Sequence, residues 1–219
     1  TPAEPVQGRE ERFSDFPKME GVMAGPGWRE ELRDRVSAGV HHLFGLTKTV
    51  GDPDGRAGLM HRQPGGTCMV VSQQQVLIQA GLLPPGDATA IELALAKQAN
   101  DRGDAVRNGV AWRDSGKLLV ERGVPVVSHA RASDERLLAA AASGRMLIAG
   151  VDAGSFWRDP LYDGGGHAIV VTGAEVDGKG KVVGLFVNDS GTGDARRYVT
   201  TELFLAAFAK DGRYFLEVL

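Results

Sequence analysis

The sequence has only one cysteine, Cys68, among its 219 residues. A single cysteine cannot form an internal disulfide, so a fold held together by disulfides is excluded. Clusters of Lys and Arg are also missing, and the formal net charge is −3. Nucleic acid is therefore not expected as the main partner, because phosphate contacts require clustered cations. No apolar run approaches the length of a membrane span, so we expect a soluble protein without a transmembrane segment.

What the chain does contain is enough apolar sequence for one core, with 42% hydrophobic and 24% charged residues. Residues 1–20 are rich in proline and charge and lack a period, so we expect an arm there. Residues 28–44 repeat apolar side chains on one helical face and predict an amphipathic helix. We therefore divide the chain into an N-terminal arm and helix, 1–55, and a core-bearing domain, 56–219.

The remaining pattern predicts helices first and strands later, which is an α+β order. After a turn-rich connection over 45–58, the expected helices cover 68–80, 89–99, 112–122, 134–142 and 202–210. Thr89 and Glu92 form a capping-box signature for the second of these helices. The expected strands cover 124–127, 146–151, 168–172, 182–187 and 214–218, with a hairpin turn at 178–180.

Cys68 stands where a glycine-rich turn, which includes Gly65 and Gly66, runs into an apolar stretch. A cysteine in the first turn of a helix feels the positive end of the helix dipole, which lowers the thiol pKa. The two glycines leave room for a peptide backbone beside the sulfur. A lone cysteine is more often a small core residue, but this setting favours a nucleophile.

A histidine and a carboxylate follow in a suitable order. His167 opens a strand-like run after Gly165 and Gly166, and the next strand-like run ends in Asn188 and Asp189. Together with Cys68 these are the parts of a cysteine–histidine–carboxylate site. Asn188 is the alternative to Asp189 as the residue that orients the imidazole.

The segments QPGGTCMVVSQQQ, GGGHAIVVTGAEVDGKGKVVGLFVNDSGTG and YVTTELFLAAF resemble papain-like cysteine peptidases, specifically the bacteriocin-processing branch and its stand-alone relatives. The resemblance covers roughly residues 60–219. It implies a two-lobed fold in which a helical lobe carries Cys68 and an antiparallel sheet lobe carries His167. It also implies that Cys68 is the nucleophile, His167 the base and Asp189 the orienting residue, while Gln63 completes the oxyanion hole. Ser190 stands where the family often has proline.

This resemblance implies hydrolysis of a peptide or protein substrate without a metal or organic cofactor, and the glycines at 65, 66, 165 and 166 are expected to lie against the substrate. Two alternatives stay open. One is a bacterial effector or toxin, secreted or delivered, that uses the same site to deamidate or crosslink a target protein. The other is a non-catalytic binding module. No zinc site is expected at His41, His42, His61 or His129, because none has partners at ligand spacing. Oligomeric state and cellular address stay open.

Overall fold

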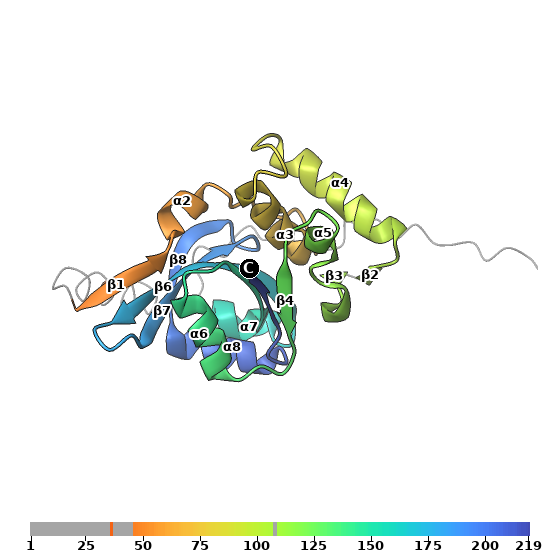
Figure 1. Ribbon diagram of the computed structural model, residues 1–219. Coiled ribbons are helices and arrows are strands. Elements are labelled where there is room, and N and C mark those ends of the chain that lie inside the picture. Colours follow the sequence, from red (N-terminus) through yellow and green to blue (C-terminus); the bar gives the residue numbers. More distant parts are fainter. Residues whose placement is uncertain (1–35, 37–45, 107–108) are drawn as a thin grey trace, which may run out of the picture.

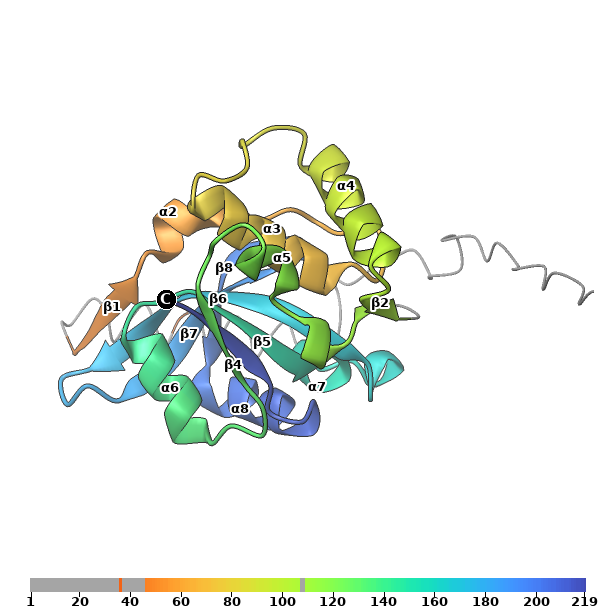
Figure 2. The same ribbon diagram turned by 45° about the vertical axis from the view of Figure 1, so that its right-hand side comes forward.

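The computed structural model describes residues 36, 46–106 and 109–219 (Figure 1). The predicted arm lies outside these residues, as does the predicted amphipathic helix apart from Val36. Within the described residues, a central antiparallel sheet is covered by helices on both faces (Figures 1 and 2). This mixture of helices and antiparallel strands confirms the predicted α+β class.

The sheet has the strand order β4-β9-β5-β6-β7-β8, and β1 also pairs with β6. The strands are β1 (Thr47–Gly51), β4 (Val126–His129), β5 (Leu147–Asp152), β6 (Gly166–Asp177), β7 (Val182–Asp189), β8 (Asp194–Thr200) and β9 (Phe215–Val218). A separate small hairpin joins β2 (Ala105–Val106) to β3 (Gly109–Val110). β5 pairs with the first half of β6, and β1 pairs with the second half. β5 and β1 therefore lie end to end along β6.

Helices lie on both faces of this sheet (Figure 2). On one side are α2 (Pro53–Ala57), α3 (Cys68–Gln79), α4 (Ala88–Asp101), η2 (Trp112–Asp114) and α5 (Lys117–Val120). On the other are α6 (Asp134–Ala142), α7 (Ala153–Trp157), η3 (Pro160–Tyr162) and α8 (Thr201–Lys210).

Alternate residues of β5 pack into the two hydrophobic cores, one on each face of the sheet. Leu147 and Ala149 pack with α6, α7 and α8, whereas Ile148 packs with α3, α4 and α5. A strand buried on both faces reads as a continuous apolar run, and this is why 146–151 was predictable.

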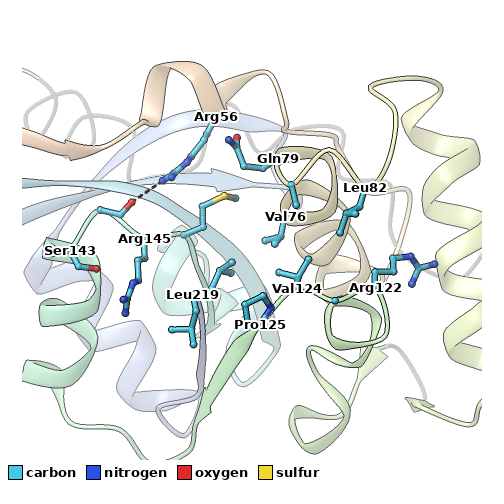
Figure 3. A pocket seen from close by; sticks show the side chains of 15 residues that line it. Arg56, Val76, Gln79, Leu82, Arg122, Val124, Pro125, Ser143, Arg145 and Leu219 are labelled. Carbon is cyan, nitrogen blue, oxygen red and sulfur yellow. Dashed lines mark hydrogen bonds between the residues drawn. The ribbon is translucent and has the colours of Figure 1, made fainter.

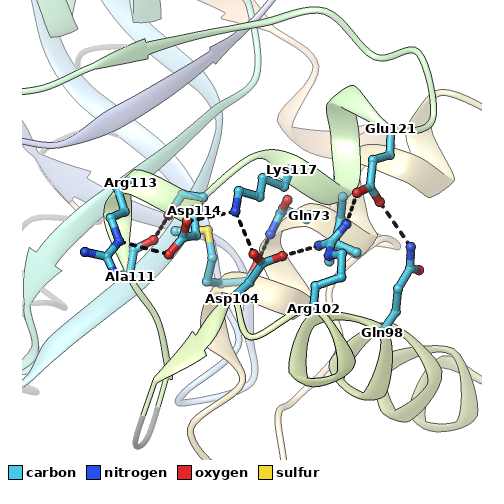
Figure 4. A network of polar contacts seen from close by, with 12 residues as sticks. Gln73, Gln98, Arg102, Asp104, Ala111, Arg113, Asp114, Lys117 and Glu121 are labelled. Atoms are coloured by element: carbon cyan, nitrogen blue, oxygen red, sulfur yellow. Dashed lines mark hydrogen bonds and ion pairs between the residues drawn. The ribbon is translucent and has the colours of Figure 1, made fainter.

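Polar side chains tie the outer helices together (Figure 4). Asp104 follows α4 and is 4% exposed; its carboxylate lies 2.6 Å from Lys117 of α5 and 2.6 Å from Arg102. Arg102 also pairs with Glu121 at the end of α5. A buried carboxylate needs such partners, and here they fix α5 against α4.

Local sequence signals explain several of the helix and strand ends. The side chain of Ser133 accepts a hydrogen bond from the Arg136 N–H at the start of α6. Gly81 and Gly144 adopt positive φ just after α3 and α6, where a left-handed residue ends a helix. Gly180 has φ 81° in the β6–β7 hairpin.

Two helix predictions were wrong. Asp87, rather than Thr89, caps α4, since its side chain accepts from the Ala90 N–H. The helix therefore begins two residues earlier than a Thr89 cap would place it, and Glu92 is buried instead of serving a capping box. The helix expected over 112–122 is divided into η2 and α5, because Gly116 has φ 84° and interrupts it.

The expected connection over 45–58 was also wrong, since it contains β1 and α2. β8 and α7 were not expected either. Asp152 is 4% exposed and caps α7 by accepting from the Ser155 N–H.

Candidate active site

Cys68 is the first residue of α3, and α3 crosses the start of β6. The Ser72 hydroxyl donates to the Ala168 carbonyl at 3.4 Å, which ties the helix to this strand. His167 precedes Ala168, is 5% exposed and interacts with the Cys68 side chain. The helix and the strand therefore bring a partly buried thiol and an imidazole together.

The other side of the imidazole faces Asp189, the last residue of β7. The distance from His167 Nε2 to Asp189 Oδ1 is 2.8 Å. Because Nε2 is engaged by the carboxylate, Nδ1 is the ring nitrogen left for the thiol. Cys68, His167 and Asp189 thus lie in series, with the imidazole between the thiol and the carboxylate.

Asp189 is fully buried and has further donors. The Trp157 indole N–H donates to Oδ2 at 2.8 Å, and the Gly191 N–H donates to Oδ1 at 2.9 Å. Arg197 lies 3.6 Å from Oδ2. The Trp157 ring also contacts His167, with ring centroids 5.0 Å apart. These contacts hold the carboxylate ionised and the imidazole in place.

The pKa values reflect this arrangement. Burial lowers the pKa of His167, but the charge and hydrogen bond of Asp189 outweigh it, so the pKa is raised to about 10. Burial raises the pKa of Cys68, yet the His167 hydrogen bond and charge, with backbone hydrogen bonds at Ala168 and Met69, bring it below its ordinary value. The pKa of Asp189 is also lowered, because His167 outweighs the effect of burial. These directions favour a thiolate beside an imidazolium.

Gln63 lies on the loop before α3 and is tied to the turn after Asp189. Its backbone N–H donates to the Ser190 carbonyl at 3.0 Å, and its side-chain Oε1 accepts from the Ser190 hydroxyl at 2.8 Å. With Oε1 engaged, any hydrogen bond from this carboxamide to a ligand comes from Nε2, which is a donor.

The glycines at 65 and 66 immediately precede Thr67, the N-cap residue of α3, and those at 165 and 166 immediately precede His167. A Cβ atom on Gly166 would lie 3.1 Å from Asp211 Oδ1, and one on Gly165 would lie 3.0 Å from the Tyr162 carbonyl. Side chains at these two positions would therefore crowd their neighbours.

Asn188, the alternative orienting residue, has other partners. Its Nδ2 donates to the Arg56 carbonyl at 2.9 Å and to Gln75 Oε1 at 2.8 Å, and its Oδ1 accepts from the Arg196 N–H at 3.0 Å. It joins α2, α3 and β8 beneath the site, while Asp189 meets His167.

Sequence reasoning missed Trp157 and Arg197 as partners of Asp189. Trp157 lies in a segment with several aspartates that was interpreted as a loop, and a tryptophan there was the available signal of a packed site. Arg197 is 6% exposed and lies over the Phe156 ring at 5.0 Å. The sequence did not indicate this burial, because an arginine is usually exposed.

His61 and His129, which had no acidic partner by sequence spacing, each meet a buried glutamate from a distant element. His61 lies 2.7 Å from Glu92, and His129 lies 3.2 Å from Glu217. Across the described ranges, no group of three His, Cys, Asp or Glu side chains is arranged to hold a metal ion.

A cavity of about 560 Å³ lies at the opposite end of α3 from Cys68 (Figure 3). Its lining includes Val76 and Gln79 of α3, with Arg56, Arg122 and Arg145 around it. It is therefore separate from the thiol and imidazole.

The fold is shared with a crystal structure from Bacillus anthracis described as a "putative C39-like peptidase". The two share 16% sequence identity with a TM-score of 0.52, and the match covers 78% of this chain and 98% of that one. At this identity the likeness establishes a common fold. No family model matches the sequence, and no curated protein matches it. In the part of the chain described, none of the helices combines the length and apolar character needed to cross a membrane.

Proposed function

We propose that the protein is a papain-like cysteine peptidase of the C39-like kind. The observation that carries this proposal is His167 held between the Cys68 side chain and Asp189, with Cys68 at the N-terminus of α3. The fold shared with a C39-like peptidase structure supports it. A structural cysteine would have no need of an imidazole that is itself fixed by a buried carboxylate.

In the proposed reaction, the Cys68 thiolate attacks the carbonyl carbon of a peptide bond while His167 is protonated. The oxyanion of the tetrahedral intermediate accepts hydrogen bonds from the Cys68 backbone N–H and Gln63 Nε2. His167 then gives its proton to the leaving amine. Water attacks the thioester with His167 as general base, which releases the acid product and restores the thiol.

We further propose that the molecule works as two lobes, with the thiol on the helical side and the imidazole on the sheet side. The substrate would lie between Gly65 and Gly66 on one side and Gly165 and Gly166 on the other. In the sequence, the segments around Cys68 and His167 favour the bacteriocin-processing branch or a stand-alone relative of it.

The test is incubation with a peptide library derived from a proteome, analysed by mass spectrometry for wild type and Cys68→Ala. New peptide termini that appear with wild type alone are the expected result. His167→Ala should also be inactive, because nucleophile and base act as a unit and such losses reach several orders of magnitude. Retention of more than about a tenth of wild-type turnover by either folded variant would contradict the assignment.

The same experiment separates the alternative chemistries. Conversion of glutamine to glutamate without new termini would indicate deamidation, and joined peptides would indicate transamidation. Rapid alkylation of Cys68 at neutral pH without cleaved, deamidated or joined peptides would show a reactive thiol but would contradict the peptidase assignment.

A further inference from the structure

Glu92, on α4, is fully buried and contacts both ends of the loop that precedes Cys68. Its Oε2 lies 2.7 Å from His61 Nε2, and its Oε1 accepts a hydrogen bond from the Thr67 hydroxyl. One carboxylate therefore fixes the loop from 61 to 67 from the side of α4. Gln63, in the middle of that loop, is held from the sheet side by Ser190.

Thr67 is the N-cap residue of α3, but its side chain makes no capping hydrogen bond. Its hydroxyl is directed to Glu92 and to the Gly65 carbonyl, 2.7 Å away. Thr200 shows what this residue type ordinarily does, because its hydroxyl accepts from the Leu203 N–H and caps α8. Asp52, Asp87, Ser133 and Asp152 cap their helices in the same way.

A capping hydroxyl would compete with the thiol. An N-cap side chain accepts from the N–H of the second or third helical residue, here Met69 or Val70. The Met69 N–H is one of the groups hydrogen-bonded to Cys68. An oxygen placed there would take this donor and offset the positive end of the helix.

We propose that Glu92 is a positioning residue that holds the Thr67 hydroxyl away from α3, so that the uncapped helix N-terminus acts on the Cys68 thiol. This inference rests on the proposed function, since a helix end kept uncapped is useful only to a reacting thiolate. His61 stands against the same carboxylate and balances its charge near the site when protonated.

Substitutions at Thr67 test this while Glu92 stays in place. Thr67→Val removes the hydroxyl and leaves nothing that can cap, so kcat should stay within about threefold of wild type. Thr67→Asn introduces a stronger capping group, so kcat should fall about 10-fold or more with little change in KM. The rate of Cys68 alkylation by iodoacetamide should also shift to higher pH in Thr67→Asn alone.

A double substitution then tests whether Glu92 acts through the Thr67 hydroxyl. Glu92→Leu frees the Thr67 hydroxyl to cap α3 and should lower kcat about 10-fold, and adding Thr67→Val should restore most of that loss. Glu121→Ala, which removes a glutamate paired with Arg102 away from this loop, is the control and should leave the alkylation profile unchanged. Equal impairment of Thr67→Val and Thr67→Asn, or wild-type behaviour of Thr67→Asn, would overturn the proposal even if Glu92→Leu fails to fold.

Alkylation needs no substrate, so it separates this inference from the proposed function. If wild type cleaves no peptide but alkylation of Thr67→Asn shifts to higher pH than alkylation of wild type, the peptidase assignment fails and the role of Glu92 stands. If wild type cleaves peptides but Thr67→Val and Thr67→Asn have identical alkylation profiles, the peptidase assignment stands and the role of Glu92 fails.

Discussion

At the scale of single residues, the site depends on His167, which lies between the carboxylate of Asp189 and the thiol of Cys68. Asp189 favours the protonated imidazole, and the protonated imidazole favours the thiolate of Cys68. The pKa shifts of Cys68 and His167 each depend on the partner residue, so a substitution at Asp189 also changes the pKa of the Cys68 thiol.

The two neighbours at the end of β7 should therefore respond differently to substitution. Asp189→Asn keeps the shape but removes the charge, and we expect kcat to fall at least ~100-fold, since the wrong tautomer is then favoured. Asn188→Ala instead leaves buried partners unpaired and should cost about 1–3 kcal/mol of stability, with kcat changed only a few-fold. Kinetics together with urea unfolding check this, and the opposite ranking in kcat would transfer the orienting role to Asn188.

The pH dependence of thiol reactivity follows from the same pair. With the Cys68 pKa lowered and the His167 pKa raised to about 10, the thiolate–imidazolium pair should persist across neutral pH. Alkylation by iodoacetamide should then change less than about threefold between about pH 6.5 and 8.5, whereas an ordinary thiol speeds up about 10-fold per pH unit in this range. Turnover should fall as pH rises through about 10, where His167 loses its proton. The urea-unfolded chain is the control and should show the ordinary steep rise.

Asp211, beside Gly166, predicts a pH effect on stability. Burial raises its pKa to about 6 and the charge of Asp152 adds to this, against opposing effects of Trp112 and His167. A carboxyl that ionises less readily when folded favours folding at low pH, and this contribution is lost as pH rises through about 6. Asp211→Asn should thus gain about 1 kcal/mol of stability near pH 8, after allowance for solvent screening, and nothing near pH 4. Urea unfolding at both pH values measures it, and an equal change at the two would show that ionisation is not involved.

At the scale of elements, the sequence predicted helices and strands best where a cap residue or an apolar run belongs to a buried element. α3 and α6 have clear ends, and β5 and β6 are apolar runs, so the elements carrying Cys68 and His167 were both expected. β1 and β8 were missed because their residues are largely polar or charged, and their pairing depends on β6 and β7, which no local window contains. Glu92 was misassigned for the same reason: its partners His61 and Thr67 are distant in sequence.

The junction of β1 with the sheet offers a test at this scale. Gly51 has φ 82°, and a Cβ atom there would lie 2.9 Å from the Gly173 Cα atom. Gly51→Ala should therefore lower the free energy of unfolding by about 2 kcal/mol, through both backbone strain and the close contact. Gly178→Ala is the matched control, because a Cβ atom at Gly178 meets nothing within 4 Å. Equal midpoints of urea unfolding for the two variants would contradict this reading of the junction.

At the scale of the whole molecule, β1 belongs to the same sheet as His167, although it lies before the expected boundary at residue 56. The Thr47 hydroxyl donates to Glu175 at 2.5 Å, and Glu175 is 2% exposed. β1 thus supplies a hydrogen-bond partner for one oxygen of a buried carboxylate in β6.

Two shortened chains test what precedes the site. A chain starting at residue 21 should keep full turnover, because residues 1–20 show no apolar period. A chain starting at Arg56 should unfold at clearly lower urea concentration, because the second half of β6 loses β1 as one of its two neighbours and Glu175 loses Thr47. Full stability of the shorter chain would show that neither β1 nor the predicted helix over 28–44 supports the fold.

The crossing of α3 over β6 has a consequence for how the protein acquires its chemistry. The thiol belongs to one layer and the imidazole to the other, joined where Ser72 meets Ala168. A chain whose sheet has formed but whose helices have not docked would contain every residue of the site and still have a thiol of ordinary reactivity. The appearance of Cys68 reactivity during refolding therefore reports when the helical layer docks on the sheet, and alkylation at successive times measures it.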